Sequence, residues 1–203
     1  MLDHAFLDVL AAWRRAFDEA LLMQDHGGET LSLDLAKGDY QWQGSCHLPG
    51  EGHPPRADAD VTLVWTPWAQ ASFREWQNGD TPDDLPEVDV LVALRLHRLS
   101  EPPDVEVVMG ALPLVGPSLG DAPLERSEVT VTQVRSAIGP GHVDAEAFYE
   151  GVWRFEDGAM EDRATLTVQA ATAAAWVASA LVRLADLPLA FLPPDPDEEH
   201  QHP

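Results

Sequence analysis

The chain has 203 residues, and 45% of them are hydrophobic, so it is long enough to bury a core and is not a disordered chain. Its 35 acidic residues against 12 basic ones give a formal net charge of -23. A charge of this sign repels phosphate backbones and disfavours direct binding to nucleic acid. The acidity has two open interpretations, which are solvation of the surface, including adaptation to salt, and electrostatic steering of a basic protein partner.

Cysteine content and the first residues predict a cytoplasmic location. Cys46 is the only cysteine, so no disulfide can form within the chain, which fits a reducing compartment. Asp3 and Asp8 stand where a secretory signal would carry positive charge. Residues 170–184, the longest apolar stretch, fall short of the ~20 residues that span a bilayer. The bias toward Ala, Leu, Val, Pro and Arg is typical of a GC-rich bacterial or archaeal genome.

The N-terminal residues predict an amphipathic helix followed by a β-hairpin. Between Leu2 and Met23, apolar residues recur at helical spacing, and they include Phe6, Leu10, Trp13 and Phe17. Residues 31–35 and 40–43 then alternate apolar and polar side chains around a turn at 37–39. The helical stripe can be a core face or a dimer seam. We favour the seam, because the chain offers more apolar helix faces than one sheet can cover.

A strand running into a short aromatic helix is predicted for the run WTPWAQASFREWQNG. Residues 48–60 form an exposed loop, and the strand covers 61–65. Thr66 can cap a helix that starts at Pro67 and ends at 78–79. Trp68, Phe73 and Trp76 share one arc of this helix, so we expect them to hold it on the sheet or across a subunit interface.

The remaining residues predict further antiparallel strands and a final helix. Strands are expected over 88–99, 105–112 and 128–134, because apolar and polar residues alternate there between Pro/Gly-rich connections. Residues 143–155 fit a helix or a strand, and we favour a strand for the second half, returning over 164–168. A helix follows over 169–187. The predicted fold class is therefore α+β, with a mostly antiparallel sheet on which an N-terminal helix, a short central aromatic helix and a C-terminal helix pack. Residues 1–192 are expected to form a single domain, which can have two lobes. Residues 193–203 are expected to form a flexible acidic tail.

No motif in the chain indicates catalysis, a metal or a cofactor. Residues 116–120 match the G-x-S-x-G pattern of a nucleophile elbow, but that chemistry needs a strand, a sharp turn and a helix around Ser118. The surrounding pattern favours a Pro/Gly turn, so a serine hydrolase at Ser118 is only an alternative hypothesis. Cys46, His47 and His53 lack the second ligand pair of a zinc site. We therefore expect a non-enzymatic protein.

The element order resembles the α-β-β-β-α-β-β-α arrangement of type III secretion chaperones and the related YbjN-like bacterial proteins. The resemblance rests on the expected helices over 2–23, 67–77 and 169–187 and on the expected strands over 31–35, 40–42 and 61–65. The chain departs from this arrangement by having extra strands between residues 128 and 168. It implies a small, acidic, cytoplasmic homodimer that binds another protein. The first hypothesis is a chaperone or adaptor for a basic partner, such as one that handles nucleic acid. The alternative is a protein that binds small apolar ligands in a cavity between a curved sheet and a helix, lined by Trp42, Trp65 and Trp153.

Overall fold

A seven-stranded antiparallel sheet forms the centre of the protein in a computed structural model. The structure describes residues 4–21, 29–34, 36–48, 54–80, 84–135, 141–155 and 163–193. The strand order is β1-β2-β3-β4-β7-β6-β5, and neighbouring strands are antiparallel. The predicted α+β class is confirmed. The strands are β1 (Glu29–Leu33), β2 (Tyr40–His47), β3 (Ala57–Trp65), β4 (Glu87–Leu99), β5 (Val115–Leu119), β6 (Ala122–Val134) and β7 (His142–Arg154). The helices in the described residues are α1 (His4–Leu21), α2 (Pro67–Gln77), α3 (Val105–Ala111) and α5 (Arg163–Ala185).

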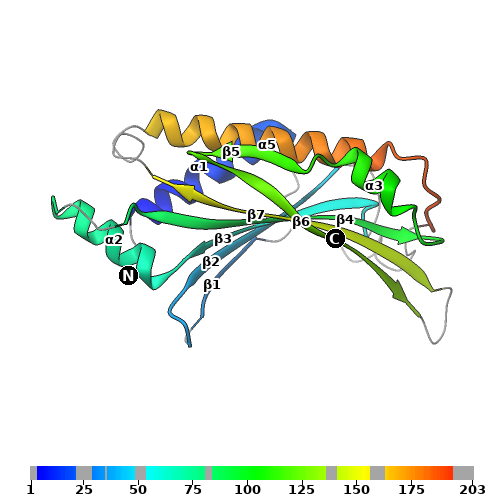
Figure 1. The fold of residues 1–203 in the computed structure, drawn as a ribbon, viewed down its shortest axis with the longest axis horizontal. Helices are drawn as coiled ribbons and strands as arrows, with labels where there is room; N and C mark the ends of the chain where they lie inside the picture. The colour runs from blue at the N-terminus through cyan, green and yellow to red at the C-terminus, as the bar shows by residue number, and fades with distance from the viewer. Residues whose placement is uncertain are drawn as a thin grey trace, which may run out of the picture.

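The two long helices cover one face of the sheet. In Figure 1, α1 and α5 lie above the strands, while the lower face has no described helix over it. The β1–β2 hairpin and the far ends of β6 and β7 run downward on either side, so the sheet is arched and its lower face is concave (Figure 1). We call this lower face the open face.

Strict alternation of side chains explains why the helices cover only one face. In β3 every second residue is buried and the residues between are only partly buried. Because cross-strand partners in an antiparallel sheet point to the same side, the buried positions of neighbouring strands form one apolar surface. This surface includes Ala57, Ala59, Val61, Leu63 and Trp65 of β3, Val88, Val90, Val92, Leu94 and Leu96 of β4, and Val143, Ala145, Ala147, Tyr149 and Trp153 of β7.

Aromatic rings fill the space between this surface and the helices. Trp13 of α1 stacks on Phe17 with 5.5 Å between ring centroids and meets the edge of Trp153 at 5.7 Å. Trp65 lies 5.3 Å from Phe6 by the same measure. The helical stripe of α1 is thus a core face of a single chain, and its interpretation as a dimer seam is wrong. Phe6, Leu10 and Trp13 are fully buried, and Phe17 is 9% exposed.

The short aromatic helix α2 begins as predicted, with the Thr66 hydroxyl accepting the backbone N–H of Ala69 at 3.2 Å. Phe73 is buried against Trp65, and Trp76 is partly buried against Phe73. Trp68 is 64% exposed, so the prediction that it holds α2 on the sheet is wrong. The buried Gln70 contributes instead, because its amide donates to the carbonyls of Trp65 and Gly38 and so joins the helix to the hairpin.

Two segments predicted as strands are helical. Residues 105–111 form α3, whose N-terminus is capped by the Asp104 carboxylate accepting the Glu106 N–H at 3.0 Å. Residues 164–168 belong to α5, while the ambiguous residues 143–155 form β7 almost entirely.

The length of α5 exceeds the prediction, and residues 164–185 are long and apolar enough to cross a membrane by length and composition. Its core-facing positions, including Ala170, Ala174, Val177 and Leu181, are fully buried here.

Beyond α5 the chain returns to the sheet at a bulge in β4. The β4–β7 register shifts between Leu96 and Leu99, and Arg98 there adopts a positive φ of 57°. The backbone N–H of Leu192 donates to the Arg98 carbonyl at 2.7 Å, and the Arg98 guanidinium donates to the Leu192 carbonyl at 2.9 Å. Phe191 forms a bridge with Leu99. Strand β3 pairs with β4 only as far as Leu96. Residues 190–192 therefore pair with the part of β4 that follows Leu96.

The aromatic core yields a direct test of stability. Replacing the fully buried Trp13 by alanine should lower the free energy of unfolding by about 3–5 kcal/mol, because it removes ring contacts and leaves a cavity. The same change at the exposed Trp68 should cost less than about 0.5 kcal/mol. Urea unfolding followed by circular dichroism measures both losses. Equal losses would contradict the assignment of the two side chains.

Candidate functional site

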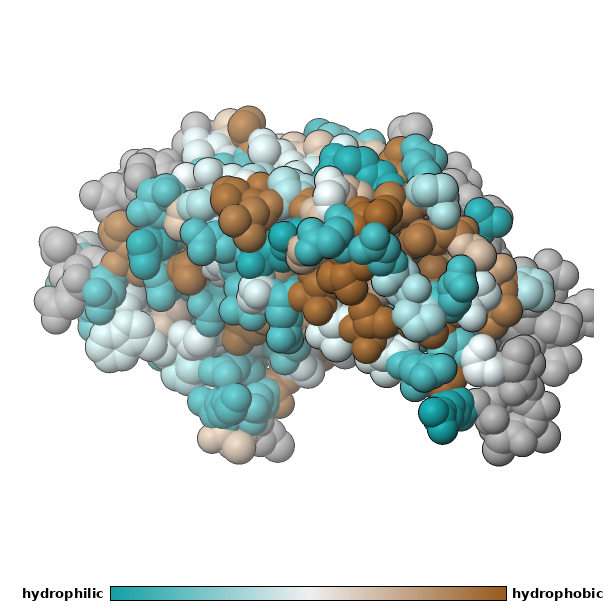
Figure 2. Space-filling model, turned by 45° about the vertical axis from the view of Figure 1, so that its right-hand side comes forward, coloured by the Kyte–Doolittle hydropathy of each residue, from teal (hydrophilic) through white to brown (hydrophobic). Residues whose placement is uncertain are grey.

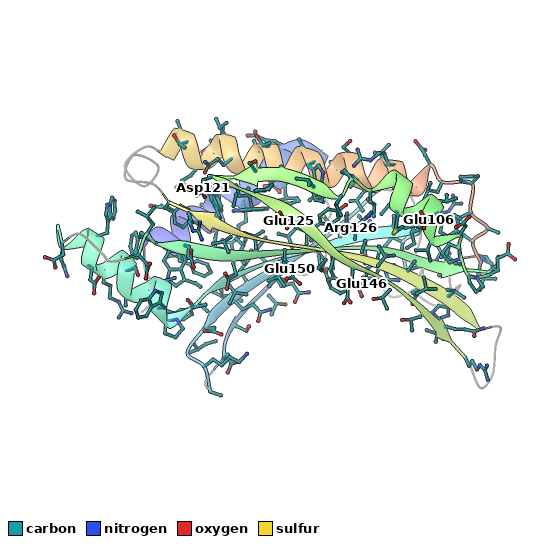
Figure 3. All side chains as sticks on the ribbon, viewed as in Figure 1. Glu106, Asp121, Glu125, Arg126, Glu146 and Glu150 are labelled. Carbon is teal, nitrogen blue, oxygen red and sulfur yellow. The ribbon has the colours of Figure 1, made fainter. Side chains whose placement is uncertain are left out.

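The open face carries a line of charged side chains across the middle of the sheet. These residues alternate with the buried residues of β3, β4 and β7, and they are Asp58 and Asp60, Arg95 and His97, and Asp144 and Glu146. The register pairs Arg95 with Asp58 on one side and with Glu146 on the other. Figure 3 labels Glu146 together with Glu150 along β7 and Glu125 on β6.

Arg95 joins three strands through its guanidinium. Its Nη1 lies 2.5 Å from Asp60 Oδ2, and its Nε lies 2.5 Å from Glu146 Oε1. Asp60 also accepts hydrogen bonds from Gln43 and from the Ser45 hydroxyl. Burial by itself would raise the pKa of Asp60, but the hydrogen bonds from Ser45 and Arg95 outweigh it, so the pKa is lowered. Asp60 is therefore charged near neutral pH and already accepts three hydrogen bonds.

His97 lies between two aspartates on neighbouring strands. Its Nε2 is 3.1 Å from Asp58 Oδ2, and its Nδ1 is 3.6 Å from Asp144 Oδ1. Asp144 also lies 3.5 Å from His142 Nε2. Burial alone would lower the pKa of His97, but the hydrogen bond and charge of Asp58 and the charge of Asp144 outweigh it, so the pKa is raised. Because both ring nitrogens face carboxylates, the protonated imidazole suits this position best.

A hollow of about 310 Å³ adjoins Arg95 on the open face. One side of its floor is apolar and consists of Val64, Leu91 and Phe148. These apolar side chains point away from the core helices and onto the open face. The other side of the floor is polar, and the full lining is Gln41, Gln43, Asp60, Thr62, Val64, Leu91, Ala93, Arg95 and Phe148. The hollow thus offers an apolar surface bordered by carboxylates, which suits a side chain with an apolar stem and a cationic head.

The apolar floor is flanked by carboxylates that pair with no cation among the described residues. Val64 faces Asp89 across the β3–β4 pair, and Leu91 faces Glu150 across the β4–β7 pair. Glu150 in turn faces Glu125 of β6, so two like charges stand opposite each other. Burial raises the pKa of Asp89, and the nearby charges of Glu87 and Asp39 raise it further. Within the described residues, the side-chain carboxylates of Asp89, Glu125 and Glu150 form no ion pair or hydrogen bond.

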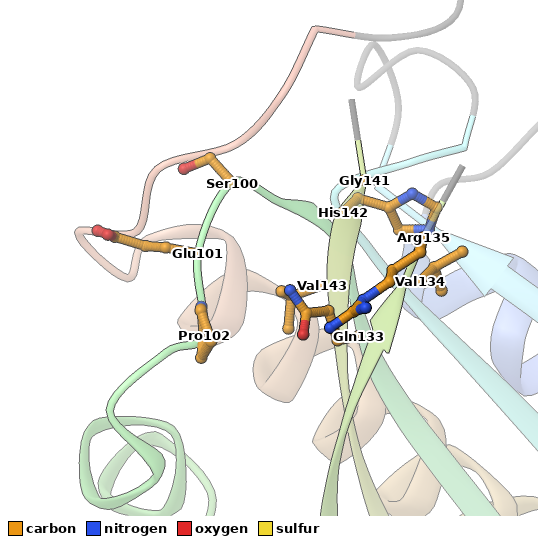
Figure 4. Close-up of a pocket in the computed structure, with 9 residues that line it drawn as sticks. All are labelled: Ser100, Glu101, Pro102, Gln133, Val134, Arg135, Gly141, His142 and Val143. Atoms are coloured by element: carbon orange, nitrogen blue, oxygen red, sulfur yellow. The ribbon is translucent and has the colours of Figure 1, made fainter. Parts of the chain in front are cut away.

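A second hollow, of about 400 Å³, lies at the far end of the sheet. Figure 4 shows Ser100, Glu101 and Pro102 on one side of it and the ends of β6 and β7 on the other. Its polar side chains, which include Gln133 and Arg135, are exposed or only partly buried. It therefore lacks a preorganised polar anchor for a ligand.

The sequence-derived candidates for chemistry that the structure describes do not assemble into a site. Ser118 lies inside β5, and Gly120 and Asp121 turn the chain directly into β6, so the strand-to-helix turn of a nucleophile elbow is not formed. Cys46 is buried, and burial together with the charges of Asp58 and Asp60 raises its pKa to about 12. His47 contacts the Leu48 carbonyl, and His53 lies outside the described residues. Within the described residues, no group of three His, Cys, Asp or Glu side chains is arranged to hold a metal ion.

The tryptophans expected to line a ligand cavity are core residues. Trp65 and Trp153 are fully buried, and Trp42 is 4% exposed. The Trp42 ring lies over Gly44, where an added Cβ would come within 2.6 Å of it. Trp153 donates its indole N–H to Gln169 of α5 at 2.7 Å. These side chains fill the space between sheet and helices, so the cavity interpretation is wrong for them.

None of the sequence-predicted packing residues lies on the open face, whereas His47 does, because it pairs with Asp58 across β2 and β3. The packing candidates Phe6, Leu10, Trp13, Phe17 and Phe73 are buried in the core, Trp76 packs against its edge, and Trp68 lies on the exposed side of α2. The charged line around Arg95 was missed. A signal for it exists in the sequence, because Asp58 and Asp60, Arg95 and His97, and Asp144 and Glu146 each occupy alternate positions in a strand.

His97 makes stability depend on pH with a definite sign. Its pKa is raised in the folded state, so its contribution is complete below the ordinary value of 6.5 and is lost as pH rises through the folded value. The stability difference between the wild type and His97→Gln should therefore shrink from about pH 5 to about pH 9. Urea unfolding at a series of pH values measures this difference. A difference that grows with pH would contradict the assignment.

Removing the Arg95 guanidinium should destabilise the sheet. Arg95→Met keeps the apolar stem but leaves Asp60, whose side chain is 13% exposed, without its cation. We expect a loss of about 2–3 kcal/mol near neutral pH. Adding Asp60→Asn should recover part of that loss, since the uncompensated charge is then gone. Chemical unfolding of both single variants and the double variant tests this coupling, and purely additive losses would contradict it.

Comparison of the chain with protein-family models, with curated proteins and with solved structures finds no match. The resemblance to secretion chaperones and YbjN-like proteins therefore stays a prediction.

Proposed function

We propose that the protein is a non-enzymatic chaperone or adaptor that binds a basic segment of a partner protein on the open face of its sheet. The observation that supports this most is the apolar floor of Val64, Leu91 and Phe148 between carboxylates that no cation of the described residues pairs with. A concave sheet face with such a floor, over which no described helix lies, suits recognition of another chain.

The chemistry of the floor favours lysine or arginine in the partner. Both residues carry a long apolar stem, which can cover Leu91 and Phe148, and a cationic head, which can reach Asp89 or Glu150. A cation placed between Glu150 and Glu125 would be attracted by both carboxylates, which face each other across the β6–β7 pair. Arg95 does not compete, because Asp60 and Glu146 already hold it.

The net charge of -23 adds a long-range contribution. A strongly acidic surface attracts a basic partner before contact and raises the association rate, and salt weakens this effect. The single cysteine, Cys46, is compatible with a role in a reducing compartment such as the cytoplasm.

A defined peptide tests the proposal. The probe is an extended peptide that alternates lysine and leucine, and its binding is measured by fluorescence anisotropy at low and high salt. The double variant Asp89→Asn/Glu150→Gln should weaken binding by about tenfold or more, because it removes two charges at the floor. The matched control, Glu106→Gln/Asp186→Asn, removes two exposed charges outside the open face, on α3 and just beyond α5.

The outcome is decided by comparing the two pairs of substitutions. A large loss in the first pair and a small one in the second supports a site on the open face. Equal losses would show that the peptide responds to net charge alone and would overturn the proposed site. No binding of the peptide at low salt would overturn the proposed function.

A further inference from the structure

Among the described residues, the outer side of β6 beyond Glu125 is a sheet edge without a strand neighbour. Strand β5 pairs only with the first residues of β6, from Ala122 to Glu125. Beyond them β6 continues to Val134 with β7 on its inner side and, among the described residues, no strand on its outer side. Most side chains of this part are exposed. Its outward backbone N–H and C=O groups are therefore open to another strand.

The residues of this edge are suited to pairing. Residues 129–134 read Val-Thr-Val-Thr-Gln-Val, without a charge, a proline or a glycine. Natural sheet edges are usually guarded by charges, prolines or short length, and none of these guards occurs in residues 129–134. The opposite edge, β1, has only five residues and contains Glu29, which pairs with Arg14 of α1.

Apolar surface adjoins this edge on the helix side. Arg126 of β6 donates to the carbonyls of Met109 and Leu112, so α3 and the residues after it lie against β6. Figure 2 shows hydrophobic residues gathered across the middle of this side of the molecule. The exposed apolar residues of these segments are Val105 (37%), Val107 (39%), Leu114 (64%), Val115 (51%) and Val131 (37%).

We propose that two copies of this chain pair through their β6 edges, antiparallel and around a two-fold axis. The axis is perpendicular to the sheet, which keeps the helices of both copies on one side and both open faces on the other. The two sheets then form one continuous sheet. The apolar surface of each copy lies next to the interface, where it can be buried along with the backbone edge.

The distribution of charge selects a second copy as the occupant. Each copy carries a net charge of -23, so two copies can approach only where charge is locally absent, and residues 129–134 are such a place. A basic partner would instead be drawn to the carboxylates of the open face. A single extended peptide could pair with the edge, but it would leave Val105 and Leu114 exposed. A folded second copy can bury both the edge and the adjoining valines and leucine.

The decisive measurement is the molecular mass in solution by sedimentation equilibrium, from micromolar concentration upward and at low and high salt. The wild type should be a dimer, and salt should strengthen it by screening the repulsion between acidic copies. Val131→Asp should weaken dimerisation by about tenfold or more, since it places like charges beside the axis. Val168→Asp makes the same change at a 64% exposed valine of α5 and should leave the dimer unchanged.

A cross-linking series keeps the proposal testable if Val131→Asp fails to fold. Cysteine is introduced singly at Thr130, Val131 and Thr132, and the native Cys46 stays silent because it is buried. At least one of these positions should form a disulfide between the two copies. The reason is that a residue near the two-fold axis lies opposite the same residue of the other copy, within bridging distance. Val168→Cys should not form one.

Two results would overturn the dimer. One is a wild type that stays monomeric at every concentration and salt level, and the other is a dimer that survives Val131→Asp with none of the edge cysteines cross-linked. Either result leaves the peptide proposal intact if the lysine-leucine peptide still binds. The opposite salt dependence of the two equilibria separates them further, because salt strengthens the dimer and weakens peptide binding.

Discussion

The structure depends on a side-chain period of two residues that continues without a break through β3 and through most of β4 and β7. This period places the fully buried apolar residues of each strand on one face, where α1 and α5 cover them. It places the residues between them on the other face, where Asp60, Arg95 and Glu146 meet. A slip of one residue in register would expose Val61 and Leu63 and bury Asp60, so the apolar core fixes the pairing on which the charged line depends.

The sequence predicts those parts of the fold that local patterns decide. The sequence predicts the apolar stripe of α1, the first hairpin and the start of α2 at Thr66 and Pro67. Each of these features is determined by residues that are close together in the chain. Helix α3 was mistaken for a strand, since Val105, Val107 and Met109 alternate by chance over seven residues. The cap at Asp104 was the competing signal. Short runs of this kind fit both periods, and the Asp104 cap decides in favour of the helix.

The candidate site was not predictable in the same way. Its residues come from strands that neighbour each other only in the folded sheet, where β7 pairs with β4 although α3, β5 and β6 lie between them in the chain. No local pattern reports that adjacency. Charge alternation could mark Arg95 and Glu146 as residues of a polar face, but it could not show that the two side chains touch.

The open face also holds charges in unfavourable positions. Glu125 and Glu150 face each other, and Asp89 is partly buried near Glu87 and pairs with no cation in the part of the chain that the structure describes. Such arrangements lower the stability of the free chain, and the aromatic core around Trp13 and Trp65 offsets their cost. Local conflicts of this kind concentrate where a protein meets something other than itself.

The position of α5 in the chain has a consequence for synthesis. All seven strands precede α5, so the ribosome completes the sheet-forming residues before the helix that covers much of their apolar face has emerged. Until then Tyr149 and Trp153 lack a covering layer that includes Trp176 and Gln169. Nascent chains with such exposed apolar surface are prone to aggregate and depend on chaperones. The newly made chain is thus most vulnerable between the emergence of β7 and that of α5.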